Sequence, residues 1–258
     1  MFYTTEITST EHESDLPMLL RTQKAYEFIE NKIHGDVLEI GCGEGYGINK
    51  YYHRANRLYL LDKSRYSERT ISKRYKNITF YRKDVDELNQ IDLPTMDCII
   101  CFQFIEHIEK QSELLNHLIS LLKPEGMLFI STPNKIQTLF PNPWHIHEFD
   151  QEGFIELTSF DNCSTTHYGI FPSKKLEPYY RDNRSNLTFL KKNALPLVLK
   201  TPKALLKLPY EIGNRINRVK LKKKHIDLFR DLSHDDYIIS EPRDNALDFL
   251  AEIKKDVT

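Results

Sequence analysis

Five short apolar runs alternate with amphipathic segments in the first half of the chain. Each run is only four or five residues long and apolar almost throughout, which is typical of strands covered on both faces of a sheet. The intervening segments carry apolar residues at helical spacing, as at Leu114, Leu115, Leu118, Ile119 and Leu122. The expected strands are Val37–Ile40, Leu58–Leu61, Ile78–Tyr81, Cys98–Phe102 and Met127–Ser131. This alternation predicts an α/β fold, a mostly parallel sheet with helices on both faces.

Two later apolar runs extend this sheet. A sixth strand is expected around Thr165–Phe171 and a last one at Leu247–Ile253, so the predicted sheet has seven strands. The stretch between them is too long for a simple connection and is interpreted as an insertion. The expected division is a helical lead-in over residues 1–35, a core over 36–171, a basic helical insertion over 172–236, and a return to the core over 237–258.

The insertion carries a strong excess of positive charge, whereas the rest of the chain is acidic. The whole sequence has 36 basic and 37 acidic residues, but Lys191–Lys224 contains eleven Lys or Arg and only Glu211 as an acid. Its apolar residues recur at helical spacing, and Pro209 is expected to separate two short amphipathic helices. The apolar positions are Leu205, Leu206, Leu208, Ile212, Ile216 and Val219.

Three roles remain open for this basic segment. It could be a solvated cover over the sheet, a contact with an anionic membrane or lipid-linked substrate, or a nucleic-acid contact. Nucleic acid is disfavoured because the rest of the chain is acidic and has no RNA-binding module. The excess of bases in Lys191–Lys224 favours the anionic membrane.

The sequence also predicts where the protein works. No stretch reaches the length of about 18 uncharged apolar residues that a membrane span needs, and the N-terminus lacks the features of a signal peptide. The four cysteines are irregularly spaced, which is poor material for disulfides. We therefore expect a cytoplasmic protein, with peripheral contact at the inner face of the membrane through Lys191–Lys224.

The sharpest motif is VLEIGCGEG, in which the first strand runs into glycines spaced G-x-G-x-G. Such a turn lets the backbone approach a ligand and directs the N–H groups of a helix start toward it. A dinucleotide fingerprint would need glycine at Tyr46. Glu39 and Glu44 would repel a pyrophosphate, whereas the sulfonium and ammonium groups of S-adenosylmethionine tolerate such acids.

Further motifs follow in a fixed order: LYLLD, KDVDEL, CFQFIEHI, LLKPEGMLFISTPN and NPWHIHEF. Together with LEIGCGEGYG, they make the chain resemble the class I S-adenosylmethionine-dependent methyltransferases over about Leu19–Phe171. Within this class it is most similar to the branch with the ubiquinone-biosynthesis O-methyltransferases and bacterial surface-glycan methyltransferases. The resemblance implies a Rossmann-like sheet and S-adenosylmethionine as cofactor.

The resemblance also implies a set of cofactor contacts. Glu39 and the glycine backbone would hold the methionine part, and Asp62 would accept hydrogen bonds from both ribose hydroxyls. Asp84 would accept from the adenine amino group while the Val85 amide meets a ring nitrogen. The full expected cofactor set is Arg21, Glu39, Gly41, Cys42, Gly43, Gly45, Asp62, Lys63, Asp84, Val85, Phe102 and Gln103.

A methyl acceptor with a hydroxyl group must lose a proton, and His107 is the first candidate for the base. Alternatively, Glu106 and His107 only cap the next helix. In ubiquinone-pathway relatives this stretch can hold a divalent metal, but Gln103 replaces the first acid, and we expect no metal. His145 and His147 are two residues apart, so an extended segment would direct both to the acceptor. Trp144 or Phe149 would form an apolar wall beside them.

The sequence therefore predicts methyl transfer to a hydroxyl or carboxyl of a glycan or lipid-linked bacterial metabolite, in polysaccharide biosynthesis. Three alternatives remain. The acceptor could be a quinone-like small molecule, it could be RNA, or the chain could be a cofactor-binding partner protein without catalysis.

Overall fold

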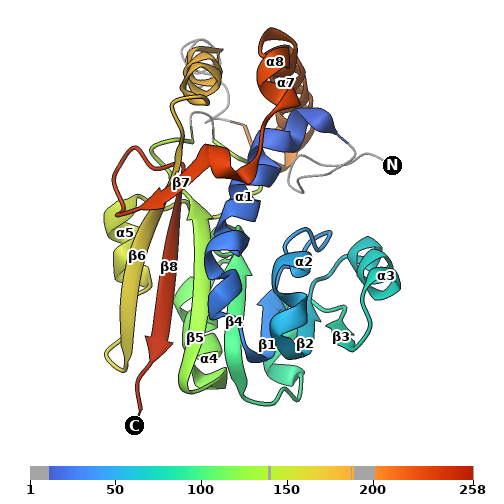
Figure 1. Ribbon diagram of the computed structural model, residues 1–258, viewed down its shortest axis with the longest axis vertical. Helices are drawn as coiled ribbons and strands as arrows, with labels where there is room; N and C mark the ends of the chain where they lie inside the picture. Colours follow the sequence, from blue (N-terminus) through green and yellow to red (C-terminus); the bar gives the residue numbers. More distant parts are fainter. Residues whose placement is uncertain (1–11, 139–140, 187, 189–200, 258) are drawn as a thin grey trace.

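The computed structural model describes residues 12–138, 141–186, 188 and 201–257, and these fold around one eight-stranded sheet (Figure 1). The strand order is β3-β2-β1-β4-β5-β8-β6-β7. The strands are β1 (Gly35–Ile40), β2 (Ala55–Leu61), β3 (Ile78–Tyr81), β4 (Met96–Phe102), β5 (Leu122–Pro133), β6 (Cys163–Pro172), β7 (Tyr237–Ser240) and β8 (Asp248–Lys255). Neighbours among β1 to β5 pair in parallel, whereas β8 runs antiparallel to both β5 and β6.

The central strands are buried on both faces, as their continuous apolar sequences predict. Successive side chains alternate between two separate cores, so Val37 joins one core and Leu38 the other. The helices α1 (Leu16–Ile29), α2 (Ile48–Tyr51) and α3 (Arg65–Arg74) contribute to the Val37 core. The helices α4 (Gln111–Leu121) and α5 (Gln151–Leu157) contribute to the Leu38 core.

The remaining helical elements lie mostly beyond the carboxyl ends of the parallel strands. Figure 1 shows α7 and α8 at that end of the sheet, next to the start of α1. These elements are α7 (Lys203–Lys224), α8 (Ile226–Arg230) and the short 3-10 helices η1 (Glu13–Asp15), η2 (Glu30–Lys32), η3 (Tyr52–Arg54), η4 (Val85–Gln90), η5 (Ile105–His107) and η6 (His234–Asp236). Residues 177–186 also form a helix.

The predicted fold class is confirmed, with one strand more than expected. The extra strand is β7, which pairs antiparallel with the end of β6 at the edge of the sheet. It has only four residues, and its apolar run, Tyr237 to Ile239, is too short to predict a strand from the sequence. Whether the four expected segments behave as separate domains stays a prediction.

The expected pair of short basic helices is wrong, because α7 is one helix of 22 residues that continues through Pro209. A proline loses one backbone hydrogen bond, but its fixed φ angle is compatible with a helix. The beginning of the basic segment, with Lys191, Lys192 and Lys200, lies outside the described residues. Across the described ranges, no helix has the length and apolar character to cross a membrane.

Candidate active site

A large cavity of about 1090 Å³ opens at the carboxyl ends of the parallel strands. Ligands bind at this edge in open α/β sheets, because the loops that follow the strands meet there. Ten residues of the predicted cofactor set line this cavity, namely Arg21, Gly41, Cys42, Gly43, Asp62, Lys63, Asp84, Val85, Phe102 and Gln103. Glu106, His107 and His145 line it too, so predicted cofactor and catalytic residues share one space.

The glycine turn after β1 forms the floor of the cavity. Gly41 has a φ of 70° and Gly43 a φ of 51°, in the left-handed region that favours glycine. A Cβ on Gly41 would clash with the ring of Phe104, whereas a Cβ on Gly43 would meet nothing within 4 Å. The backbone at Gly43 therefore borders open space, where a ligand can approach it closely. Gly45 is not among the lining residues and packs near Ile71 and Ile48.

Asp62 follows β2 and is fixed beside the glycine turn. Its Oδ2 accepts a hydrogen bond from the Gly43 N–H at 2.9 Å, and its Oδ1 accepts from the Ser64 N–H at 2.7 Å. Burial raises the pKa of this carboxyl above its ordinary value. A carboxylate has about four acceptor sites, so these two bonds orient Asp62 and leave capacity for ligand hydroxyls.

Asp84 and Val85 border the cavity after β3. Asp84 is the N-cap of η4, and its carboxylate accepts from the Asp86 N–H at 3.4 Å within a capping box. Val85 is buried and lines the cavity beside it. Asp84 therefore serves a helix cap, and its predicted contact with adenine stays a prediction.

Glu39 differs from the expectation, because it is not among the lining residues. It is buried within the fold, and its carboxylate accepts hydrogen bonds from the hydroxyls of Tyr26 and Tyr51. Burial raises its pKa to about 7. Tyr26 lines the cavity and donates to Glu39, so this hydrogen bond connects Glu39 to the cavity lining.

Arg21 lines the cavity but is already paired. Its Nε lies 2.7 Å from Oδ2 of Asp248, a buried acid at the start of β8. The sequence analysis missed Asp248, although an acid that opens an apolar strand is an unusual feature. The predicted contact between Arg21 and the cofactor carboxylate stays a prediction.

Phe102 is the last residue of β4, and Gln103 follows it. Gln103 has a φ of 51°, and its Nε2 lies 3.3 Å from the hydroxyl of Ser131, to which it can donate. A left-handed conformation is uncommon for a residue with a side chain and marks a tight turn. This turn leads directly into η5, which carries the two predicted catalytic residues.

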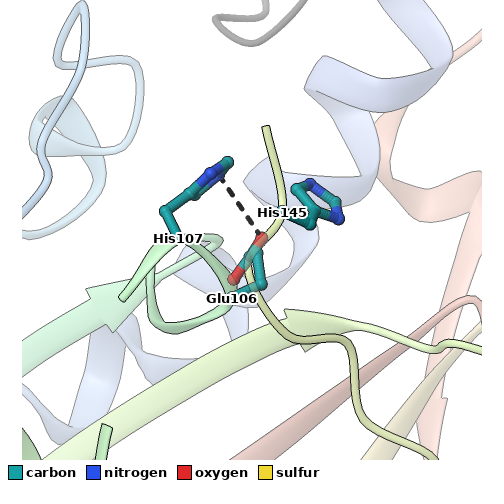
Figure 2. A group of neighbouring side chains, drawn as sticks. All are labelled: Glu106, His107 and His145. Atoms are coloured by element: carbon teal, nitrogen blue, oxygen red, sulfur yellow. Dashed lines mark ion pairs between the residues drawn. The ribbon is translucent and has the colours of Figure 1, made fainter. Parts of the chain in front are cut away.

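The side chains of Glu106 and His107 approach each other, as Figure 2 shows, and both residues line the cavity. Nε2 of His107 lies 4.0 Å from Oε1 of Glu106. Nδ1 of His107 lies 3.0 Å from the carbonyl oxygen of Trp144. A carbonyl only accepts, so Nδ1 carries the proton and Nε2 is the acceptor nitrogen.

Burial governs the charge of both groups. It raises the pKa of Glu106 to about 7 and, together with the nearby His145, lowers the pKa of His107 to about 4. The imidazole of His107 is therefore neutral near pH 7. Thr132 donates a hydrogen bond to Glu106 at 3.2 Å, which fixes the carboxylate next to it.

The loop after β5 separates the two histidines that were expected to project together. His145 lines the cavity, and its ring centre lies 4.9 Å from that of His107. His147 is exposed and lines a different, shallow pocket with Phe149. The expectation of a shared side is wrong, because the chain bends at Ile146, between the two histidines, and is not extended there.

Trp144 also has a different task from the one expected. Its indole N–H donates to Glu211 of α7 at 2.9 Å, and Nζ of Lys207 lies 3.6 Å from the centre of its ring. Trp144 and Phe149 are not among the cavity-lining residues, so neither forms the predicted apolar wall. Trp144 instead fastens the loop after β5 to α7.

Glu106, His107 and His145 could in principle offer ligands to one metal ion, because three of their ligand atoms lie within 4.8 Å of one another. Both nitrogens of His145 already have partners, however. Nδ1 lies 2.6 Å from Oε1 of Glu148, and Nε2 lies 2.8 Å from the amide of Asn142. Metal binding would disrupt the second contact, and the absence of a metal stays a prediction.

The opposite wall of the cavity was not predicted. It comes from the helix at 177–186 and from α7, and it is rich in tyrosine, amide and arginine side chains. These residues are Tyr179, Tyr180, Asn183, Arg184, Tyr210, Asn214, Asn217 and Arg218. Asn217 donates to Asn183 at 2.7 Å, which links the two helices. Local sequence patterns carry no signal for a wall built from two separate helices.

Comparisons with known proteins agree with this geometry. The family model described as "Methyltransferase domain" matches residues 11–182, so the chain belongs to the methyltransferase domain family. A Mycolicibacterium smegmatis protein named "Probable S-adenosylmethionine-dependent methyltransferase" is 33% identical over 148 residues, which cover 53% of this chain and 55% of that protein. A ubiquinone biosynthesis O-methyltransferase of Rickettsia conorii is 26% identical over 132 residues, which cover 49% and 45%.

Solved structures share the fold at low sequence identity. The YcgJ protein of Bacillus subtilis has a TM-score of 0.53 at 14% identity, over 91% of this chain and 99% of that one. The plantazolicin methyltransferase BamL has a TM-score of 0.52 at 15% identity, over 93% and 86%. The predicted methyltransferase family is confirmed, and the chain spans about half the length of the curated relatives it matches.

The residues at the strand ends fit S-adenosylmethionine. Gly43 leaves open space, and the Asp62 carboxylate offers acceptors beside it to hydroxyl groups. The acid Glu44, which lines the cavity, suits a cationic ligand better than a phosphate.

Proposed function

We propose that this protein transfers a methyl group from S-adenosylmethionine to a hydroxyl or carboxyl oxygen of a glycan or lipid-linked glycan. The observation that carries the proposal is one cavity with two unlike walls. One wall is the strand-end site around Gly43 and Asp62, and the other is the tyrosine and amide wall. His107 borders the same space.

His107 is proposed as the base. Its Nε2 has no proton, because Nδ1 donates to Trp144, and it can accept the proton of an acceptor hydroxyl. S-adenosylmethionine, when bound, supplies the methyl group. The acceptor oxygen attacks the methyl carbon, the bond between this carbon and the sulfur breaks, and the electron pair of that bond goes to the sulfur. For a carboxylate acceptor no proton has to be removed, so His107 would then only orient the oxygen.

Glu106 supports this base. Proton transfer leaves a positive imidazolium on His107, and an ionised carboxylate 4.0 Å away stabilises that charge in a buried site. Because burial raises the pKa of Glu106 to about 7, the supporting charge is present only above about neutral pH. The Glu106–His107 pair therefore gives the reaction a pH dependence.

The second wall supports a sugar-like acceptor. Asn183, Asn214 and Asn217 offer amide groups that both donate and accept, which suits hydroxyl groups that do the same. Tyr179 and Tyr210 add aromatic surface and Arg184 a positive charge. A quinone ring would need fewer polar partners, so this wall favours a glycan over the quinone-like alternative.

The direct test is to incubate the protein with S-adenosylmethionine carrying a labelled methyl group and with separate oligosaccharide, glycolipid and quinol fractions. Label in the oligosaccharide or glycolipid fraction, lost in His107→Ala if the acceptor is a hydroxyl, would support the proposal. Label only in the quinol fraction would show that the acceptor is a quinone-like small molecule and not a glycan. No transfer to any fraction, despite cofactor binding, would favour a binding protein without catalysis.

A further inference from the structure

The helix α7 presents its apolar residues to the outside of the molecule. Leu205, Leu208, Ile212, Ile216 and Val219 follow one another at spacings of three and four, so they share one helix face. All five are exposed, with exposed fractions of 68% at Leu205 and 52% at Ile212. These five residues form the outer stripe of α7.

The opposite face of α7 is polar and lies against the protein. Tyr210, Asn214, Asn217 and Arg218 line the cavity, while Leu221 is the one α7 residue that is buried. A helix on a protein surface ordinarily turns its apolar face inward and its polar face to water. The arrangement in α7 is the reverse, so the outer stripe needs a partner outside the described fold.

The C-terminal half of α7 is fixed to the body by ion pairs. Arg215 and Arg218 contact buried Asp15 of η1 at 2.8 and 3.0 Å, and Lys224 contacts Asp182 at 2.8 Å. Lys222 pairs with Glu13. These contacts hold α7 in its orientation and explain why the outer stripe cannot simply rotate inward.

We propose that the outer stripe of α7 docks on an anionic lipid surface. Lys223 continues the stripe, because it lies four residues after Val219, and Lys220 flanks it, four residues after Ile216. Both lysines are exposed, and within the described part of the chain neither forms an ion pair. Apolar side chains flanked by lysine are the features by which a helix lies in the interface of an anionic membrane.

Charge decides between a lipid surface and a second copy of the chain. α7 carries eight Lys or Arg and only one acid, Glu211, over its 22 residues. Two such helices packed stripe to stripe would bring together two segments with a net charge of +7 each (eight bases minus one acid), and like charges repel. An anionic surface instead attracts these bases.

The location of α7 gives this docking a consequence. The same helix that shows the outer stripe to the outside forms part of the cavity wall on its other side. A membrane-bound protein would hold its cavity next to the lipid surface. A lipid-linked acceptor could then enter without leaving the membrane.

The experiment is flotation with phosphatidylcholine vesicles that contain or lack phosphatidylglycerol, at low and high salt and without any methyl acceptor. We expect the wild-type protein to float with the anionic vesicles at low salt and much less with the neutral ones. The triple variant Leu205→Gln, Leu208→Gln, Ile212→Gln should bind about tenfold more weakly or worse. Ile238→Gln, which removes an equally exposed apolar side chain from β7, should bind like wild type.

A second variant tests the charge alone. Lys220→Glu with Lys223→Glu should lose anionic binding and keep the wild-type melting temperature, because no described contact is broken. Equal recovery with both vesicle types, or none with either, would overturn the proposal. So would unchanged binding of the triple variant, or a dimer in sedimentation that the triple variant converts to a monomer.

Discussion

Asp62 and His107 border the same cavity, but their substitution should have different effects, on cofactor binding for Asp62 and on turnover for His107. Asp62→Ala removes acceptors for ribose hydroxyls and releases the Gly43 and Ser64 N–H groups that fix the turn. Its loss should weaken S-adenosylmethionine binding at least tenfold, or by ~1.5 to 3 kcal/mol. Calorimetry measures this, with exposed Asp161→Ala as a control that keeps full affinity. Unchanged affinity in Asp62→Ala would mean that the cofactor lies elsewhere.

His107→Ala should spare binding and damage turnover with a hydroxyl acceptor. Loss of a general base lowers kcat by ~10² to 10⁴, while the affinity for S-adenosylmethionine stays near the wild-type value. Parallel losses of cofactor binding and melting temperature would instead identify a structural histidine. Full activity after exhaustive chelation would exclude a catalytic metal at Glu106, His107 and His145.

The pH profile of turnover tests Glu106 separately. Its pKa is raised to about 7 by burial, so kcat should fall as the pH drops from 8 to 6 and the supporting charge is lost. His107 stays neutral over this range, because its pKa is lowered to about 4. Glu106→Gln should give a lower rate with a flatter profile between pH 6 and 8. An unchanged profile in Glu106→Gln would assign the titration to another group.

Among the elements, η1 and α7 depend on each other through Asp15. This carboxylate is buried and receives hydrogen bonds from both Arg215 and Arg218. Asp15→Asn keeps the shape but removes the charge, so it should lower the free energy of unfolding by about 1 to 3 kcal/mol. The control Asp227→Asn breaks an exposed pair with Arg230 and should change it by less than about 0.5 kcal/mol. Equal effects would show that Asp15 does not hold α7.

Sequence patterns predicted the parallel strands well, because β1, β2, β4 and β5 are largely buried and their sequences are nearly continuous apolar runs. The β3 prediction agrees with the structure residue for residue. The same patterns could not orient α7, since periodicity shows that one face is apolar but not which way that face points. Its orientation depends on Asp15 and Asp182, which are far away in the sequence.

The candidate site was predictable wherever a role follows directly from the end of a strand. Gly43, Asp62 and His107 come right after strands, and all three line the cavity. The predicted positions of Glu39 and His147 in the site were wrong. The hydrogen bonds from Tyr26 and Tyr51 to Glu39, and the bend before His147, arise from tertiary contacts. Such contacts leave no local pattern.

For the whole molecule, buried acids make stability depend on pH. Burial raises the pKa of Glu39 and of Glu106 to about 7, from an ordinary value near 4.5. Between these values the folded state binds more protons than the unfolded state, so stability falls as the pH rises through about 7. From pH 6 to 8 each group should remove on the order of 1 kcal/mol.

Thermal unfolding at pH 6 and 8 measures this dependence. Glu39→Gln keeps a hydrogen-bonding group between Tyr26 and Tyr51 but cannot ionise, so it should lose less stability over this range than wild type. A wild-type melting temperature that rises from pH 6 to 8 would contradict the assignment. His107 partly opposes the trend at the lower end of this range, because its pKa is lowered to about 4 and stability is therefore lost as the pH falls below about 6.5.

The central claim is that one cavity holds the cofactor on the strand side and the acceptor on the α7 side, with His107 bordering both. A crystal structure with S-adenosylhomocysteine tests it most directly. The account predicts the ligand over Gly43, with its ribose on Asp62 and its sulfur on the side of His107. A ligand bound outside this cavity, or with its ribose away from Asp62, would contradict the account.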